Sequence, residues 1–125
     1  MVTEKLDFQE AENNCQARSL FERQSHLMSI ASMDENTFLK NYTKDVFGRS
    51  YFALWIGLND RVSPQHFVWT DGSNTSYRNF KAGEPTHSQN EDCVALWYGE
   101  EWNDYGCVYK LDSVCKMPGR FSSRK

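Results

Sequence analysis

The chain has 125 residues and a net charge of −3 at pH 7; 39% of its residues are hydrophobic and 14% are aromatic. That length suits one compact domain, and the aromatic content supplies bulk for a single core. The mildly acidic balance argues against a nucleic-acid module, and no apolar run approaches the ~18 residues of a membrane span. Because no signal peptide is recognisable at the N-terminus, we expect a cytosolic chain or a mature or excised piece of a larger protein.

The N-terminal third has the spacing of helices. Phe8, Ala11 and Cys15 follow an i, i+3, i+7 pattern, which places them on one helix face. Asp7 is a suitable N-cap for this helix, and Glu10 adds an acidic side chain near its start. The pattern predicts a helix that begins after Asp7 and packs one face on the core.

A second helix is predicted after Ser32, which forms a capping-box pattern with Glu35 three residues later. Gly48 can end this helix. Between them runs an apolar stripe at helical spacing, which we interpret as core packing; its members are Phe38, Leu39, Tyr42 and Val46.

From residue 51 onward the pattern changes to strands and loops. Apolar, aromatic-rich runs predict strands at 51–58, 67–69 and 93–98, and a possible last strand at 108–115. The polar stretch 74–90 is rich in Gly, Ser, Asn and Pro and predicts a long loop, which in compact domains is often functional.

The cysteine count indicates an oxidising compartment. An even number in a short chain is consistent with two disulfides, for which three pairings are possible. Zinc binding is disfavoured, since no close C-x₂-C pair is present. Two N-x-[ST] sequons, at Asn41 and Asn74, also favour a secreted protein in an oxidising compartment. The four cysteines are Cys15, Cys93, Cys107 and Cys115.

Oxygen-bearing side chains concentrate between residues 84 and 104. Calcium takes six to eight oxygen ligands in flexible geometry, so such a segment suits this ion. The EF-hand loop pattern is absent, and a plain solvated acidic loop is the alternative that composition leaves open. The side chains concerned are Glu84, Thr86, Asn90, Glu91, Asp92, Glu100, Glu101, Asn103 and Asp104.

Several short motifs occur in order along the chain: Trp55-Ile56-Gly57-Leu58, Trp69-Thr70-Asp71-Gly72, Glu84-Pro85-Thr86, Glu91-Asp92-Cys93 and Trp102-Asn103-Asp104. Each is weak alone, but together with the four cysteines they resemble a C-type lectin-like domain over nearly the whole length. The resemblance implies an α+β fold with two helices, two small antiparallel sheets and a long calcium-binding loop. It also implies the four-cysteine short form, with disulfides Cys15–Cys115 and Cys93–Cys107. We expect the domain to span residues 1–117, followed by a flexible tail or linker stub at 118–125.

The resemblance further implies a primary calcium site where ion and sugar hydroxyls share ligands. Thr86 stands where the family has Asn, and its shorter side chain carries one hydroxyl, so we expect weakened calcium or sugar affinity. Carried over by motif, the metal ligands are Glu84, Thr86, Glu91, Asn103 and Asp104, of which Glu84, Thr86, Glu91 and Asn103 would also contact sugar.

A secondary calcium site occurs in some members of the family. Asp60, Glu91 and Asp92 match its ligand positions. Pro64 falls where a further carboxylate is usual, so the site looks incomplete.

The implied function is calcium-dependent binding of glycans on cell surfaces or glycoproteins, outside the cell and without catalysis. The order that begins with Glu84 favours mannose, fucose or GlcNAc-type sugars, and galactose remains possible. The main alternative is a protein-binding module that has lost its calcium or keeps it for structure. Exposed aromatics would serve it: Trp97, Tyr98 and Tyr105.

A pair of carboxylates is also the catalytic machinery of a glycosidase. The available pairs are Glu84 with Glu91 and Glu100 with Glu101. No other feature of the sequence supports hydrolysis.

Overall fold

The computed structural model describes residues 2–19, 23–47, 53–84, 91–97 and 101–117. Within these residues the chain forms two helices, α1 (Phe8–Gln16) and α2 (Met33–Phe47), and eight strands. No helix in the described part of the chain is long and apolar enough to cross a membrane. The strands are β1 (Val2–Leu6), β2 (His26–Leu27), β3 (Ala53–Asn59), β4 (Val68–Trp69), β5 (Cys93–Trp97), β6 (Glu101–Tyr105), β7 (Leu111–Ser113) and β8 (Cys115–Lys116).

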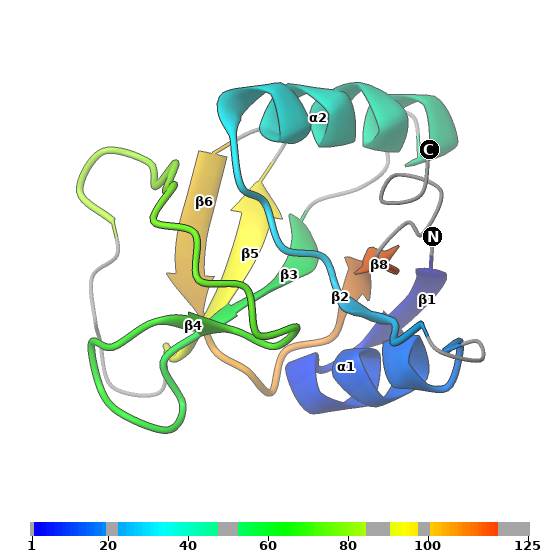
Figure 1. The fold of residues 1–125 in the computed structure, drawn as a ribbon, viewed down its shortest axis with the longest axis horizontal. Coiled ribbons are helices and arrows are strands. Elements are labelled where there is room, and N and C mark those ends of the chain that lie inside the picture. Colours follow the sequence, from blue (N-terminus) through cyan, green and yellow to red (C-terminus); the bar gives the residue numbers. More distant parts are fainter. Residues whose placement is uncertain (1, 20–22, 48–52, 85–90, 98–100, 118–125) are drawn as a thin grey trace.

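The strands form two sheets, with α1 and α2 at opposite ends of the molecule (Figure 1). The larger sheet has the order β1-β7-β3-β5-β6, with β4 paired to β3, and the smaller sheet is the pair β2-β8. Every pairing is antiparallel except that of β3 with β7. The expected α+β fold with two sheets is confirmed, with one parallel pair and three unpredicted strands, β1, β2 and β6.

Helix α1 forms as the sequence predicts. Asp7 accepts a hydrogen bond from the backbone of Glu10, whose side chain accepts one from the Asp7 amide, completing a capping box. Phe8, Ala11 and Cys15 are fully buried. The Cys15–Cys115 disulfide then joins α1 to β8, and a second disulfide, Cys93–Cys107, joins the start of β5 to the segment after β6. Both implied pairings are confirmed.

Helix α2 begins at the predicted cap, where the Glu35 amide donates to Ser32 Oγ at 3.1 Å. The interpretation of its apolar stripe as core packing is wrong for three of four residues. Leu39 is 1% exposed, whereas the exposed fractions of Phe38, Tyr42 and Val46 are 62%, 39% and 45%. The predicted end at Gly48 lies outside the described residues.

The buried face of α2 is partly polar. For this reason the spacing of its apolar residues predicts the wrong buried face. Asn36 and Thr43 lie at i−3 and i+4 from Leu39, and both are fully buried. The Thr43 hydroxyl donates to the Leu39 carbonyl oxygen at 2.9 Å, so its burial leaves no donor unsatisfied. Asn36 uses its side-chain oxygen to accept from an indole of the core.

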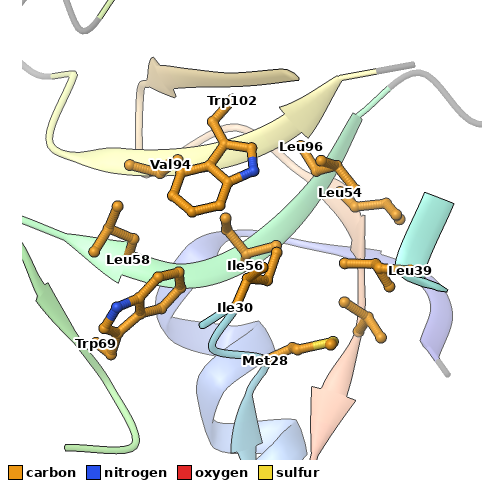
Figure 2. Packing of buried hydrophobic residues seen from close by; sticks show 11 residues of the cluster. Met28, Ile30, Leu39, Leu54, Ile56, Leu58, Trp69, Val94, Leu96 and Trp102 are labelled. Carbon is orange, nitrogen blue, oxygen red and sulfur yellow. The ribbon is translucent and has the colours of Figure 1, made fainter. Parts of the chain in front are cut away.

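That indole belongs to Trp102, which is fully buried and lies beside Val94 among the core side chains (Figure 2). Its Nε1 donates to Asn36 Oδ1 at 2.9 Å. Three aromatic rings meet it edge-on, with centroids 5.7–5.8 Å away. These rings belong to Trp69, Tyr77 and Phe80. The tryptophans expected in the core, Trp55, Trp69 and Trp102, are confirmed there.

Trp102 also fixes the path of the loop that follows β4. Its amide donates to the Asn79 carbonyl at 3.1 Å, and its carbonyl accepts from the Lys81 amide at 2.9 Å. Residues 79–81 therefore lie along β6, with Phe80 bridged parallel to Trp102. We name residues 79–84 the arm, because they carry the chain from the core to Glu84.

Asn36→Ala is expected to lower stability by about 1–3 kcal/mol, because the buried indole N–H of Trp102 would lose its acceptor. Thermal or urea unfolding measures the difference. Thr37→Ala, at an exposed position on the same helix, is the control and should change stability by less than about 0.5 kcal/mol. Equal effects of the two substitutions would contradict the assigned role of Asn36.

The same helix gives a second comparison. Leu39→Ala should cost about 2–5 kcal/mol by leaving a cavity in the core. Phe38→Ala should change stability by no more than about 0.5 kcal/mol, because that ring is mostly exposed. A large loss of unfolding free energy for Phe38→Ala in urea denaturation would contradict this assignment and indicate that the apolar stripe packs in the core.

Candidate functional site

Three aspartates meet at one edge of the larger sheet. Asp60 directly follows β3, Asp92 directly precedes β5, and Asp104 lies in β6. The order of these neighbouring strands brings the aspartates together: the Asp60 amide donates to the Asp92 carbonyl at 2.9 Å, and Asp104 pairs with Val94. Asp60 and Asp104 are only 4% and 2% exposed.

The three carboxylates repel one another. Burial raises the pKa of Asp92 above its ordinary value, and the negative charge of Asp60, a hydrogen bond shared with the Asp60 carboxyl and the charge of Asp104 raise it further. Ionising Asp92 in the metal-free domain therefore costs more free energy than ionising a solvent-exposed aspartate. A bound cation would relieve this repulsion.

Two buried side-chain oxygens lack a hydrogen-bond donor, one directly after β3 and one in β6. Asp60 Oδ1 and Asn103 Oδ1 are buried, and neither accepts a hydrogen bond from another described residue. The second Asp60 oxygen, Oδ2, accepts from the Gln65 amide at 2.8 Å. A buried acceptor without a donor is costly, and a hard cation satisfies it as well as a donor does. The oxygens present therefore fit calcium by their chemistry.

Two further predicted ligands, Glu84 and Glu91, lie among the described residues. Glu84 is half-buried at the end of the arm, in a turn where its amide donates to the Lys81 carbonyl at 2.8 Å and Gly83 adopts a φ of +87°. Glu91 is half-buried and adjoins Asp92. Thr86 lies outside the described residues. Among the residues that are described, no three His, Cys, Asp or Glu side chains are already arranged to hold a metal ion.

Two of the residues expected to form a secondary calcium site are hydrogen-bonded to each other through the backbone. The Asp60 amide donates to the Asp92 carbonyl at 2.9 Å, and Glu91 is adjacent to Asp92 in sequence. The expected fourth carboxylate is replaced by Pro64, which is exposed in the loop after β3. Sequence reasoning missed the neighbouring Gln65, whose left-handed φ of 65° accompanies its amide hydrogen bond to Asp60. No sequence signal marks it, because the contact is made by its backbone.

The aromatic residues of the alternative, protein-binding hypothesis are less exposed than it requires. Trp97 and Tyr105 are half-buried and pack edge to face, with ring centroids 5.8 Å apart. Tyr105 also contacts Trp55 at 6.2 Å, so it belongs to the edge of the core. Tyr109 is 56% exposed. Tyr98 lies outside the described residues.

Asp60→Asn is expected to raise the Tm of the metal-free domain by a few degrees at pH 7, because it removes one charge facing Asp92. The gain should shrink as pH falls, since Asp92, with its raised pKa, then takes up a proton that relieves the same repulsion. Calorimetry in EDTA from pH 7 to pH 4 measures both trends. Asp45→Asn, at an exposed position of α2, is the control; a lower Tm for Asp60→Asn in EDTA would contradict the assigned repulsion.

Solved structures share this fold. The lectin CEL-I from Cucumaria echinata superposes with a TM-score of 0.86 at 28% identity, covering 92% of this chain and 85% of that one. The herring type II antifreeze protein superposes with a TM-score of 0.77 at 26% identity, covering 91% and 84%. The fold therefore occurs in lectins and in a protein named for another activity.

Sequence relatives are lectins and receptors. The chain is 38% identical over 114 residues to an alpha-N-acetylgalactosamine-specific lectin of Patiria pectinifera, covering 88% of this chain and 67% of that protein. It is 37% identical over 125 residues to rat C-type mannose receptor 2, of which it spans only 8%. The family model described as "Lectin C-type domain" matches residues 4–117. The chain belongs to the C-type lectin domain family, whose members are carbohydrate-binding, non-enzymatic proteins.

Proposed function

We propose that this domain binds carbohydrate through calcium at the edge of the larger sheet. The observation that carries the proposal is the buried Asn103 Oδ1, which accepts no hydrogen bond from the described residues. It lies in β6 next to Asp104, on the strand whose Trp102 holds the arm that ends at Glu84. Calcium would satisfy this oxygen and neutralise the nearby carboxylates.

In this proposal each residue has a distinct role. Glu84, Glu91 and Asp104 supply carboxylate oxygens to the ion, and Asn103 supplies its amide oxygen. Calcium supplies a charge that attracts two vicinal sugar hydroxyls. The Asn103 amide N–H donates to one hydroxyl, while Glu84 and Glu91 accept from hydroxyl protons. Thr86 contributes its single hydroxyl to ion and sugar.

Asp60, Glu91 and Asp92 form a second, weaker calcium site in the same proposal. Asp60 would contribute Oδ1, because its Oδ2 already accepts from the Gln65 amide, and the hydrogen bond from the Asp60 amide to the Asp92 carbonyl keeps these two residues adjacent. Pro64 offers no side-chain oxygen, so fewer protein ligands remain for an ion here. We expect this site to fill only after the primary one.

For the sugar class we propose mannose, fucose or GlcNAc, because Glu84 precedes Pro85 in the order associated with these sugars. Rat C-type mannose receptor 2 is a relative whose name fits this class. The Patiria lectin is specific for alpha-N-acetylgalactosamine, which makes galactose-type sugars the second candidate. The two disulfides favour an extracellular location, as a secreted protein or an ectodomain. We also propose that the domain spans residues 1–117, which agrees with the family match over residues 4–117.

A protein-binding module is the second candidate function. Its support is the exposed apolar side chains of α2. The herring antifreeze protein shows that the fold also occurs in a protein that is not named as a lectin. In this case Glu84→Gln would leave the activity intact, since calcium would be either lost or kept only for structure.

Retention on mannose and on N-acetylgalactosamine resins, with calcium and with EDTA, tests the main proposal. The wild-type domain should be retained on one resin only with calcium, and Glu91→Ala or Asn103→Ala should each abolish retention. Glu101→Ala, an exposed position of the same strand β6, is the control and should be retained normally. Retention that survives EDTA, or that survives both site substitutions, would contradict the proposed site.

Thr86→Asn should strengthen binding to the mannose resin about tenfold or more, because it restores an amide donor and a longer oxygen ligand. The substitution also creates a new sequon with Ser88, so it is best combined with Ser88→Ala and compared with Ser88→Ala alone. Isothermal titration with mannose gives the two dissociation constants. Equal constants, or a gain for galactose instead, would contradict the assigned role of Thr86.

A further inference from the structure

The two sequons of this chain lie in very different surroundings. Asn41-Tyr42-Thr43 is part of α2, and Asn74-Thr75-Ser76 is part of the loop between β4 and the arm. Attachment of an oligosaccharide needs an accessible Asn side chain and the hydroxyl two residues later. The sequence alone does not separate the two, but the structure does.

Asn74 lies at an exposed point of a loop that is fixed on both sides. Before it, Asp71 accepts from the Ser73 amide at 2.9 Å and from the Ser29 hydroxyl. After it, the Thr75 hydroxyl donates to the Ala31 carbonyl at 3.4 Å. Asn74 itself is exposed, so a bulky group on its side chain displaces no packed residue.

The hydroxyl residue of this sequon is also accessible. Ser76 is exposed, as is Asn74, while Thr75 between them makes the contacts that hold the loop. The loop residues carry no helix or strand hydrogen bonds that an enzyme would need to break, since neither element is assigned to the described residues 70–79. This is the surface-loop setting expected of a modified sequon.

The sequon at Asn41 has the opposite arrangement. Asn41 is exposed, but Thr43 is fully buried. The Thr43 hydroxyl donates to the Leu39 carbonyl at 2.9 Å and lies 3.1 Å from the Lys40 carbonyl. An enzyme could reach this hydroxyl only by unwinding α2 at Leu39, a core residue.

We propose that Asn74 is an N-glycosylation site of the folded domain and that Asn41 is not. The reaction joins Asn74 Nδ2 to the anomeric carbon of an oligosaccharide carried on a polyprenyl pyrophosphate. The anomeric carbon–oxygen bond breaks, the pyrophosphate leaves with that electron pair, and the amide nitrogen loses one proton. The glycan then stands over the connection between β2 and α2, to which Asp71 and Thr75 are bonded. The inference rests on the extracellular location proposed above.

The test uses the oxidised, folded domain made without glycans. The domain is incubated with an oligosaccharyltransferase and its lipid-linked donor, and the modified residue is mapped by mass spectrometry. We expect one oligosaccharide on Asn74, lost in Asn74→Gln and in Ser76→Ala and retained in Asn41→Gln. A peptide of residues 71–79 is the control for enzyme activity.

Two results would overturn the proposal. One is the absence of transfer to Asn74 in the folded domain while the peptide is modified. The other is modification of Asn41 in the folded domain to an equal or greater extent than Asn74. Neither result bears on calcium or sugar binding, so this inference and the proposed function can fail separately.

Discussion

The buried hydrogen bond from the Trp102 indole to Asn36 is the contact on which the rest of the structure depends. It lets the largest side chain of β6 enter the core with its polar atom satisfied, and it attaches α2 to the sheet at the same point. The backbone of Trp102 binds the arm through Asn79 and Lys81. One residue thus connects helix, sheet and arm.

The candidate site follows directly from this arrangement. With Trp102 in the core, Asn103 and Asp104 are placed at the edge where β3 and β5 bring Asp60 and Asp92. The Cys93–Cys107 disulfide adjoins this edge and closes a span of 14 residues, which in the chain-entropy model contributes about 3 kcal/mol. This stabilisation offsets part of the repulsion between the carboxylates at this edge when no cation is bound.

The features that depend on residues close together in the sequence are the ones that the sequence predicts best. The capping box at Asp7 is local, so α1 was placed correctly. The buried face of α2 was misplaced because Asn36 and Thr43 are core residues only through partners distant in sequence or through the helix backbone. Strand β6 was missed because Glu101–Tyr105 is mostly polar, and its strand character comes from pairing with β5. The disulfide pairing came from family resemblance, since four cysteines alone allow three pairings.

The central claim is that this edge binds calcium, and the Tm in about 5 mM calcium compared with EDTA tests it most directly. Extracellular calcium modules have a Kd of about 10⁻⁴–10⁻³ M, which at this concentration corresponds to about 1–2 kcal/mol of stabilisation. The account predicts a rise of several degrees for the wild-type domain, and a much smaller one for Asn103→Ala. An equal Tm in calcium and EDTA would contradict it and direct attention to protein partners.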